Sequence, residues 1–234
     1  MPLISRQLLH VVLTFLVTVG SLLAAETTTT PAIHSPERHP KFMEDIKAMG
    51  GKIDLVFIGD SITDGWRGRG KPIWDKAFGA YNPLNLGISG DATQHVLWRV
   101  QNGELDGYKA KLFVVMIGTN NGSPADTVAN GIQAIIKEIQ TRQPQAKILL
   151  LGIFPREEKP GARRKKNEDT NAIIAKWDNG KTLRYLDIGE KFLDEDKSTL
   201  PKSIMPDSLH PNAKGYQIWA DAISGTVKEM MESK

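Results

Sequence analysis

Residues 53–64 read Ile-Asp-Leu-Val-Phe-Ile-Gly-Asp-Ser-Ile-Thr-Asp, and this stretch decides the expected fold. Its first six residues are apolar at all but one position, which is typical of a strand buried on both faces of a sheet. The run then ends in a glycine and an aspartate, so Ser61 is expected at the tip of a strand. A serine hydroxyl in such a place can act as a nucleophile when a base lies within hydrogen-bond reach.

Four further short apolar runs follow along the chain, at residues 84–86, 112–117, 148–154 and 183–188. Stretches with helical apolar spacing or helix-start residues lie between them, at residues 93–101, 126–142, 167–177 and 212–231. Strands that alternate with helices, and that are apolar at nearly every position, predict a parallel sheet covered on both faces. We find no internal repeat and therefore expect a single α/β domain.

Five polar or small residues stand where these elements would end or begin. Ser61 follows the first apolar run, Gly87 the second and Asn120 the third. His210 directly precedes the last helical stretch, and Asp207 stands three residues before it. Because the ligand crevice of a parallel α/β sheet lies outside the carboxyl ends of its strands, we expect these residues to converge on one rim.

A serine nucleophile needs a base, and the histidines offer few candidates. Three of the five histidines precede residue 40, which leaves His95 and His210. Asp207 is close enough to His210 for one turn to let its carboxylate hold the imidazole tautomer. His95 has no acid placed to orient it, so we favour a helix or pocket-wall position for it. The expected catalytic residues are therefore Ser61, His210 and Asp207.

Acyl transfer also requires donors aimed at the oxygen that becomes negative. The backbone N–H groups of Ser61 and Gly87 and the side-chain amide of Asn120 are the expected oxyanion hole. Purely structural alternatives are a turn glycine at Gly87 and a loop cap at Asn120.

Three other patterns in the sequence resemble known kinds of site. Residues 65–71 have the glycine and lysine spacing of a phosphate-binding loop, but Pro72 replaces the required Ser or Thr and the stretch begins beyond the first strand. Residues 87–91 lack the final glycine of a Gly-x-Ser-x-Gly elbow, which argues against the common α/β-hydrolase arrangement. For Asp60 and Asp64 we favour structural hydrogen bonding over a metal pair.

The N-terminal segment has the pattern of an export signal. Arg6 precedes an apolar stretch that ends in small residues. We expect a signal peptide over residues 1–25, a Thr- and Pro-rich linker over 26–40 and the domain over 41–234. The protein is then exported to the periplasm or secreted, with no membrane span after cleavage. An uncleaved N-terminal anchor is the alternative.

Composition excludes several classes of function. The chain of 234 residues has 30 basic and 27 acidic side chains and a net charge of +3, which is too even to suggest nucleic acid as a partner. It has no cysteine, which excludes disulfides, thiolate metal sites and a cysteine nucleophile.

The blocks that contain Ser61, Gly87, Asn120 and His210 resemble those of the SGNH, or GDSL, hydrolases, a family named for such residues. Asn121 departs from the pattern, because many members have aspartate there. Longer stretches look very similar to the catalytic subunits of intracellular platelet-activating factor acetylhydrolase, at residues 84–91, 95–99, 102–105, 141–147 and 151–156. The likeness runs from about residue 53 to the C-terminus.

This resemblance implies a three-layer α/β/α sandwich with a flavodoxin-like, five-stranded parallel sheet. It also implies hydrolysis of short acyl esters, especially acetyl esters, without a metal or other cofactor, and a homodimer. An O-acetylated carbohydrate and a lipid like platelet-activating factor are both expected substrates. Two alternatives stay open: a thioesterase or lysophospholipase of the same family, and a non-catalytic carbohydrate- or partner-binding module on the same scaffold.

Overall fold

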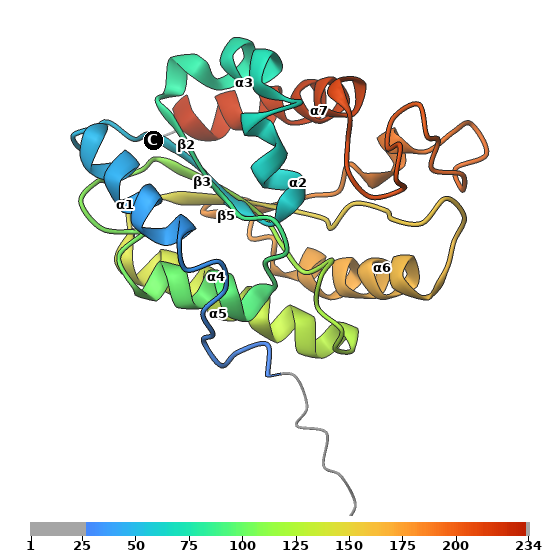
Figure 1. Cartoon of the computed structure of the whole chain (residues 1–234), viewed down its shortest axis with the longest axis horizontal. Coiled ribbons are helices and arrows are strands. Elements are labelled where there is room, and N and C mark those ends of the chain that lie inside the picture. The colour runs from blue at the N-terminus through green and yellow to red at the C-terminus, as the bar shows by residue number, and fades with distance from the viewer. Residues whose placement is uncertain (1–26, 233–234) are drawn as a thin grey trace, which may run out of the picture.

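A computed structural model describes residues 27–232, so the expected signal peptide lies outside the described residues. Five strands form one parallel sheet in the order β2-β1-β3-β4-β5 (Figure 1). The strands are β1 (Leu55–Gly59), β2 (Pro83–Gly87), β3 (Leu112–Met116), β4 (Lys147–Leu151) and β5 (Leu183–Leu186). The expected flavodoxin-like sheet is confirmed, and every strand falls within or beside a run found in the sequence.

The helices are α1 (Arg38–Ala48), α2 (Ser61–Asp64), α3 (Lys71–Phe78), α4 (Thr93–Gln101), α5 (Ala125–Arg142), α6 (Ala162–Ile174) and α7 (Ala213–Glu232). Helix α4 has the expected bounds, whereas α6 begins five residues earlier than expected and passes into a 3₁₀ turn at Ala175–Trp177. The sequence did not indicate α1, α2 or α3. None of the helices between residues 27 and 232 combines the length and apolar character needed to cross a bilayer.

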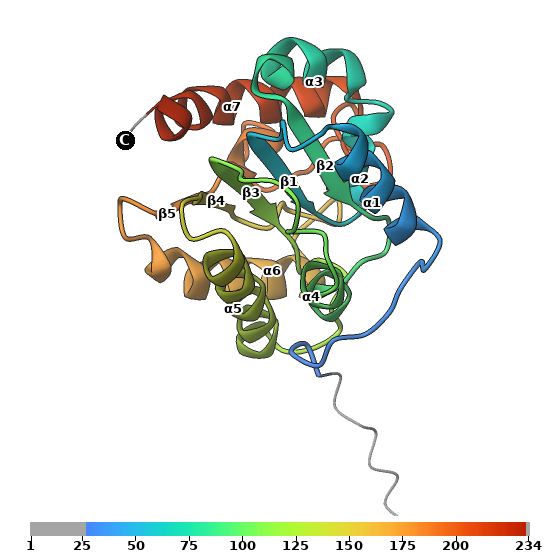
Figure 2. The same cartoon turned by 90° about the vertical axis from the view of Figure 1, so that its left-hand side faces the viewer.

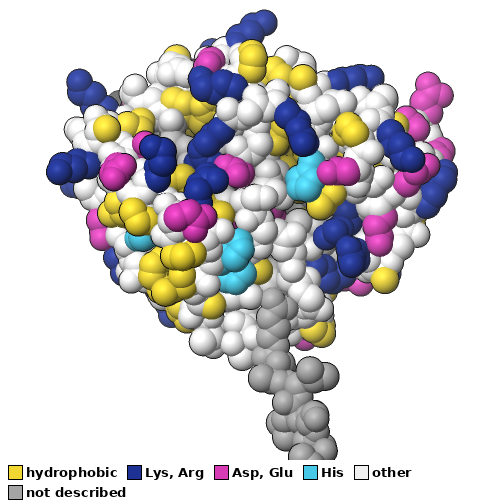
Figure 3. Space-filling view, in the orientation of Figure 1, with side chains coloured by type: hydrophobic (Ala, Val, Ile, Leu, Met, Phe, Trp, Pro, Cys, Tyr) yellow, Lys and Arg dark blue, Asp and Glu magenta, His cyan; other side chains and the backbone are white. Residues whose placement is uncertain are grey.

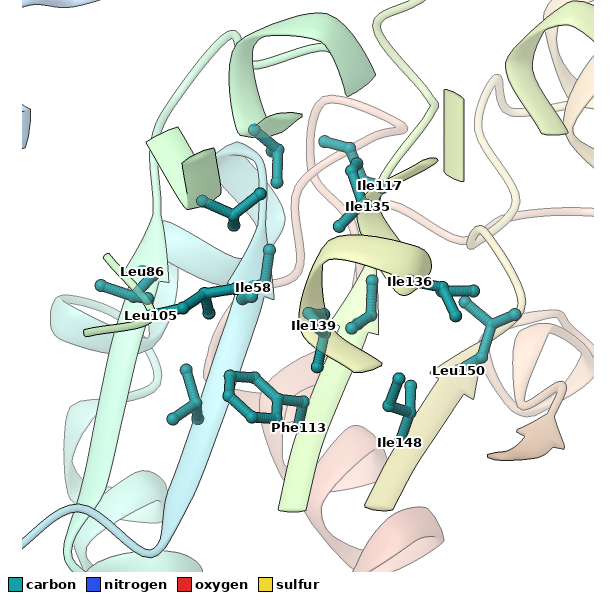
Figure 4. Packing of buried hydrophobic residues seen from close by; sticks show 14 of the residues in the cluster. Ile58, Leu86, Leu105, Phe113, Ile117, Ile135, Ile136, Ile139, Ile148 and Leu150 are labelled. Atoms are coloured by element: carbon teal, nitrogen blue, oxygen red, sulfur yellow. The ribbon is translucent and has the colours of Figure 1, made fainter. Parts of the chain in front are cut away.

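Alternation along β1 divides the core between the two faces of the sheet. Val56 and Ile58 pack with α4, α5 and α6 on one face, while Leu55 and Phe57 pack with α3 and α7 on the other (Figure 2). Figure 4 shows the first face, where Leu86, Phe113 and Ile148 from three strands meet Ile135 and Ile139 from α5. Helices on both faces confirm the expected three layers.

An aromatic cluster holds the segment that follows Ser61 against the second face. Trp66 and Trp219 are each about 1% exposed or less, and their ring centroids lie 5.0 Å apart. The Phe57 ring lies 6.5 Å from that of Trp66. Trp66 stands in the 3₁₀ turn Gly65–Arg67, directly after α2, so the cluster fixes the position of the helix that begins at Ser61.

Several residues within the expected linker over residues 26–40 contact the fold, and α1 begins before residue 41, where the domain was expected to start. Thr28 is 1% exposed and donates a hydrogen bond of 2.6 Å to the Thr127 carbonyl on α5. Helix α1 begins at Arg38 and buries Phe42 and Ile46, which are four residues apart and so share one helix face.

Candidate active site

Ser61 is the first residue of α2, directly beyond the carboxyl end of β1. The Asp60 carboxylate accepts a 2.9 Å hydrogen bond from the Ile62 N–H and so caps this short helix. Gly59 is required at the end of the strand, because a Cβ there would overlap the Thr63 side chain and the Met116 carbonyl. The tight turn thus presents the Ser61 hydroxyl at the edge of the sheet.

Ser61, His210 and Asp207 are joined by two hydrogen bonds, as the sequence predicted. The Ser61 Oγ lies 2.8 Å from the His210 Nε2, and the His210 Nδ1 lies 2.6 Å from the Asp207 Oδ2. The other oxygen of Asp207 accepts from the backbone N–H groups of Leu209 at 3.1 Å and His210 at 2.7 Å. One turn therefore holds the carboxylate, the imidazole and the backbone in a fixed relation.

The surroundings of Asp207 favour its charged form. Burial alone would raise the pKa of this carboxyl, but hydrogen bonds from the His210 N–H, the His210 imidazole and the Leu209 N–H outweigh burial and hold the pKa below its ordinary value. A carboxylate at this place keeps the proton of His210 on Nδ1 and leaves Nε2 free to accept the proton of the serine hydroxyl.

Asn120 stands in the loop after β3, the strand that pairs with β1 in the sheet. Its amide donates a 2.9 Å hydrogen bond to the Asp91 carbonyl. The neighbouring Asn121 is buried and bonds to α4: its Oδ1 accepts from the Thr93 N–H at 3.2 Å, and its amide donates to the side chains of Thr93 and Gln94. Asparagine at this position therefore fastens the loop to the start of α4.

The structure contradicts the expected oxyanion role of Gly87. Its N–H donates a 2.8 Å hydrogen bond to the Asn85 side chain, so this donor is already used inside the fold. A Cβ on Gly87 would overlap the backbone of Asp64 and lie 2.8 Å from the Thr63 carbonyl carbon. Glycine is needed here because α2 packs directly on the end of β2.

Gly90 offers the donor that Gly87 does not. It has a φ of +85°, and the Asp91 N–H bonds to the Ile88 carbonyl at 3.2 Å, so residues 88–91 form a tight turn that requires glycine. Gly90 is exposed, and its N–H enters none of the hydrogen bonds found between residues 27 and 232. The Asn120 amide bonds to the carbonyl of the next residue, Asp91, so the two loops that carry Gly90 and Asn120 are in contact. The sequence signal was the second glycine of this loop, three residues beyond the strand end.

His34, Asp91 and His95 are the one group, among residues 27–232, whose ligand atoms could reach a common metal ion; these atoms lie within 4.8 Å of one another. Asp91 already binds the Arg99 guanidinium at 2.7 Å and the His34 Nδ1 at 2.9 Å. The His95 Nδ1 accepts from the Ala92 N–H at 3.0 Å. We therefore interpret the group as a hydrogen-bonded network.

This network connects the N-terminal segment to α4. Arg99 is 1% exposed and also pairs with the fully buried carboxylate of Glu104, which lies 3.1 Å from the His39 Nδ1. The His95 and His34 rings are stacked with centroids 4.7 Å apart, and His95 lies on α4, one of the two positions that the sequence favoured. His34 and His39 were missed because they fell in the expected linker.

Two acidic residues beside the serine act as hydrogen-bond acceptors, as expected. Asp64 accepts from Arg38 at 3.0 Å and from Arg67. Asp60 is 1% exposed, and burial, with a smaller contribution from the charge of Asp91, raises its pKa to about 7. The glycine-rich stretch that resembled a phosphate loop forms a 3₁₀ turn, and its Lys71 pairs with Asp75.

Ser61 and His210 open into a cleft of about 720 Å³. Its lining is rich in charged side chains and includes few large apolar groups, chiefly Phe42 and Tyr216. The Tyr216 hydroxyl donates a 2.7 Å hydrogen bond to the Ile62 carbonyl, which joins α7 to the helix that carries the serine. The cleft can admit a small polar ester to the serine.

Comparison with known proteins agrees with this geometry. Residues 57–218 match the GDSL-like Lipase/Acylhydrolase family. The chain is 38% identical over 197 residues to the human platelet-activating factor acetylhydrolase IB subunit alpha2, covering 83% of this chain and 84% of that protein. It is 39% identical over 180 residues to the human alpha1 subunit, covering 76% of each.

Solved structures with the same fold are more distant in sequence. A GDSL-like lipase from Bacteroides thetaiotaomicron superimposes with a TM-score of 0.69 at 19% identity, covering 82% of this chain and 97% of that one. A carbohydrate acetylesterase from Sinorhizobium meliloti superimposes with a TM-score of 0.61 at 16% identity, covering 76% of this chain and all of that one. At such identities the likeness establishes the fold alone.

Proposed function

The chain belongs to the GDSL-like lipase/acylhydrolase family and is a carboxylic ester hydrolase, and we propose that it removes acetyl or similarly short acyl groups through Ser61, His210 and Asp207. The observation that carries this proposal is the unbroken pair of hydrogen bonds from the Ser61 hydroxyl through His210 to Asp207. A nucleophile, a base within reach and an acid that orients the base are the parts that acyl transfer requires.

The first half of the reaction forms an acyl-enzyme. The Ser61 Oγ attacks the ester carbonyl carbon while the His210 Nε2 takes the hydroxyl proton. The carbonyl oxygen becomes negative and accepts hydrogen bonds from the Ser61 N–H, the Gly90 N–H and the Asn120 amide. One such donor is typically worth about 3–4 kcal/mol of transition-state stabilisation. The bond between the acyl carbon and the alcohol oxygen then breaks as the carbonyl re-forms, and His210 gives its proton to the leaving alcohol.

The second half releases the acid. Water enters, His210 Nε2 takes a proton from it, and the resulting hydroxide attacks the acyl carbon. The same donors hold the oxyanion, the bond to Ser61 breaks, and His210 gives the proton back to the Ser61 oxygen. Throughout, Asp207 keeps the imidazole oriented and stabilises the imidazolium while it exists.

The lining of the cleft supports a short acyl chain. Few large apolar side chains face it, whereas a thioesterase or lysophospholipase that prefers long chains needs an extended apolar groove. One of the named relatives points the same way, since it is a platelet-activating factor acetylhydrolase subunit. We propose an O-acetylated carbohydrate or a lipid like platelet-activating factor as the substrate.

The test measures initial rates of hydrolysis of p-nitrophenyl acetate, butyrate and octanoate by the protein and its Ser61→Ala variant. We expect the rate to fall with chain length and to vanish in the variant. Ser224→Ala, which changes a serine that bonds within α7, serves as the matched control and should retain the rate. Wild-type turnover by Ser61→Ala would contradict the assignment, and a long-chain optimum would favour the lysophospholipase alternative. No turnover by a folded protein would favour the binding-module alternative.

Export and dimer formation are further parts of the proposal, and both rest on the sequence. The apolar N-terminal stretch supports a signal peptide over residues 1–25, and the resemblance to paired catalytic subunits supports a homodimer. Edman sequencing of the protein recovered outside the cytoplasm should begin at Glu26; an intact Met1 there would favour the uncleaved anchor. Light scattering at micromolar concentration should give twice the mass of the chain.

A further inference from the structure

The cleft beside Ser61 is lined by an excess of positive charge. It contains four cationic side chains, Arg38, Lys41, Arg67 and Arg69, against two carboxylates, Asp45 and Asp64. The local balance is therefore +2 with His210 neutral, in a chain whose 234 residues sum to only +3. Figure 3 shows many basic side chains on the face that also carries histidines. The excess is a property of this cleft, since the chain as a whole is nearly balanced.

Two of the four cations are held in place by the fold. Arg38 and Arg67 both bind the Asp64 carboxylate, and Arg67 also donates to the carbonyls of Asn85 and Gly87. Both guanidinium groups lie over the Phe42 ring, at 5.5 Å and 4.9 Å from its centroid. Asp64 thus balances part of their charge, and the pair forms an ordered, positively charged wall.

The other two cations, Lys41 and Arg69, are not paired with acidic side chains of residues 27–232. Lys41 and Arg69 are exposed, and neither forms an ion pair or side-chain hydrogen bond within residues 27–232. The loop that carries Arg69 is nonetheless tightly packed, because the Gly70 N–H bonds to the Gly65 carbonyl at 3.1 Å and a Cβ on Gly70 would lie 2.9 Å from the Tyr216 ring. These charges are therefore presented to the cleft from fixed backbone positions.

We infer that this cleft binds an anionic group on the alcohol half of the substrate, so that the enzyme acts on short acyl esters of alcohols that carry a carboxylate or a phosphate. The inference rests on the proposed esterase function and narrows its substrate class. The acyl half is small, so the alcohol is the part large enough to reach Lys41 and Arg69 from the serine. Arginine and lysine are the side chains that recognise carboxylates and phosphates.

The experiment compares pairs of acetyl esters that differ in charge on the alcohol. One pair is a mono-O-acetyl methyl galacturonoside and its neutral methyl ester; the other is 1-O-acetylglycerol 3-phosphate and 1-O-acetylglycerol. We expect the full-length protein to show kcat/KM at least about tenfold higher for the charged member, because a unit charge near two unpaired cations gains on the order of a tenfold preference. The pair with the larger ratio identifies carboxylate or phosphate as the preferred anion. Raising the ionic strength from about 20 to 500 mM should reduce the ratio.

The variant Lys41→Gln/Arg69→Gln removes both unpaired charges. We expect it to lower the charged-to-neutral ratio of kcat/KM about tenfold, mainly through KM. Lys47→Gln/Lys76→Gln makes the same change in net charge at exposed lysines on α1 and α3 that do not line the cleft, and should keep the wild-type ratio. Inhibition of p-nitrophenyl acetate hydrolysis by methyl galacturonoside and by inorganic phosphate provides a second readout, and both inhibitors should weaken in the cleft variant.

The failure of this inference differs from the failure of the proposed function. Suppose that wild type hydrolyses the neutral esters, that Ser61→Ala is inactive, and that the charged-to-neutral ratio of kcat/KM in wild type is near one. This result would overturn the anion site and leave the proposed esterase function intact. An equal loss of ratio in the Lys47/Lys76 variant would also overturn it, since general steering by net charge would then explain the preference. If no ester is hydrolysed, the proposed function fails and the anion site fails with it.

Discussion

The buried carboxyl of Asp60 should make the stability of the protein fall as the pH rises. Its pKa is raised from 3.8 to about 7 by burial. Between these values the unfolded chain loses the proton of Asp60 while the folded protein keeps it, so unfolding becomes more favourable with each unit of pH. The destabilisation is absent well below pH 3.8, grows between about pH 4 and 7, and is constant above.

The magnitude follows from the size of this pKa shift. A shift of about three units corresponds to about 4 kcal/mol of unfolding free energy, since one unit is worth about 1.4 kcal/mol. About 3 kcal/mol of that develops between pH 4.5 and pH 8. Asp60→Asn keeps an oxygen that can accept from the Ile62 N–H but cannot ionise. We expect the variant to gain about 3 kcal/mol relative to wild type over this range of pH.

Urea unfolding followed by circular dichroism at pH 4.5, 6 and 8 measures this difference. Asp75→Asn is the matched control, because Asp75 is exposed and pairs with Lys71. Between pH 4.5 and 8, its free energy of unfolding relative to wild type should vary by less than about 0.5 kcal/mol. A constant difference between wild type and Asp60→Asn at all three pH values would refute the reasoning, because Asp60 would then have the same pKa folded and unfolded.

Three further substitutions test other parts of the structure. Asp207→Asn should lower kcat about 10⁴-fold while leaving the fold intact, because an asparagine whose oxygen keeps the two backbone N–H groups turns its amide nitrogen toward His210 and favours the wrong imidazole tautomer; an unchanged initial rate would remove Asp207 from the mechanism. Arg99→Met should destabilise the protein by about 3–5 kcal/mol in urea unfolding, since two buried carboxylates lose their counter-charge, and a change below about 1 kcal/mol would show that they are solvated. Gly87→Ala should lower stability by about 1–3 kcal/mol in thermal unfolding, whereas Gly79→Ala, where a Cβ would meet nothing within 4 Å, should not.

The sheet and the candidate catalytic residues could be predicted from the sequence, because both depend on local patterns. Each strand is a short apolar run, and parallel strands bring their carboxyl ends to one edge. Ser61, Asn120 and His210 were therefore expected at one rim without any knowledge of tertiary contacts. The structure joins Ser61 to His210 and has Asn120 in the loop after β3, the strand next to β1.

Features that depend on packing were not readable. Helix α1 is strongly polar and has only two buried residues, so its apolar signal in the sequence is weak. On the fold, its Phe42 ring packs under the guanidinium groups of Arg38 and Arg67, a contact that the sequence does not reveal. In the sequence, nothing distinguishes the role of Gly87 from that of Gly90. Only the hydrogen bond from Gly87 to Asn85 and the positive φ of Gly90 separate a packing glycine from one with a free N–H.

The bond between Ser61 and His210 joins residues 149 positions apart in the chain. The serine is among the first residues of the fold to be synthesised, whereas its base stands immediately before the last helix. Under the proposed mechanism a growing polypeptide therefore has no activated nucleophile until residue 210 has been synthesised and has reached Ser61. Chains that terminate before residue 207 lack both the base and the carboxylate that orients it, and we expect them to be inactive.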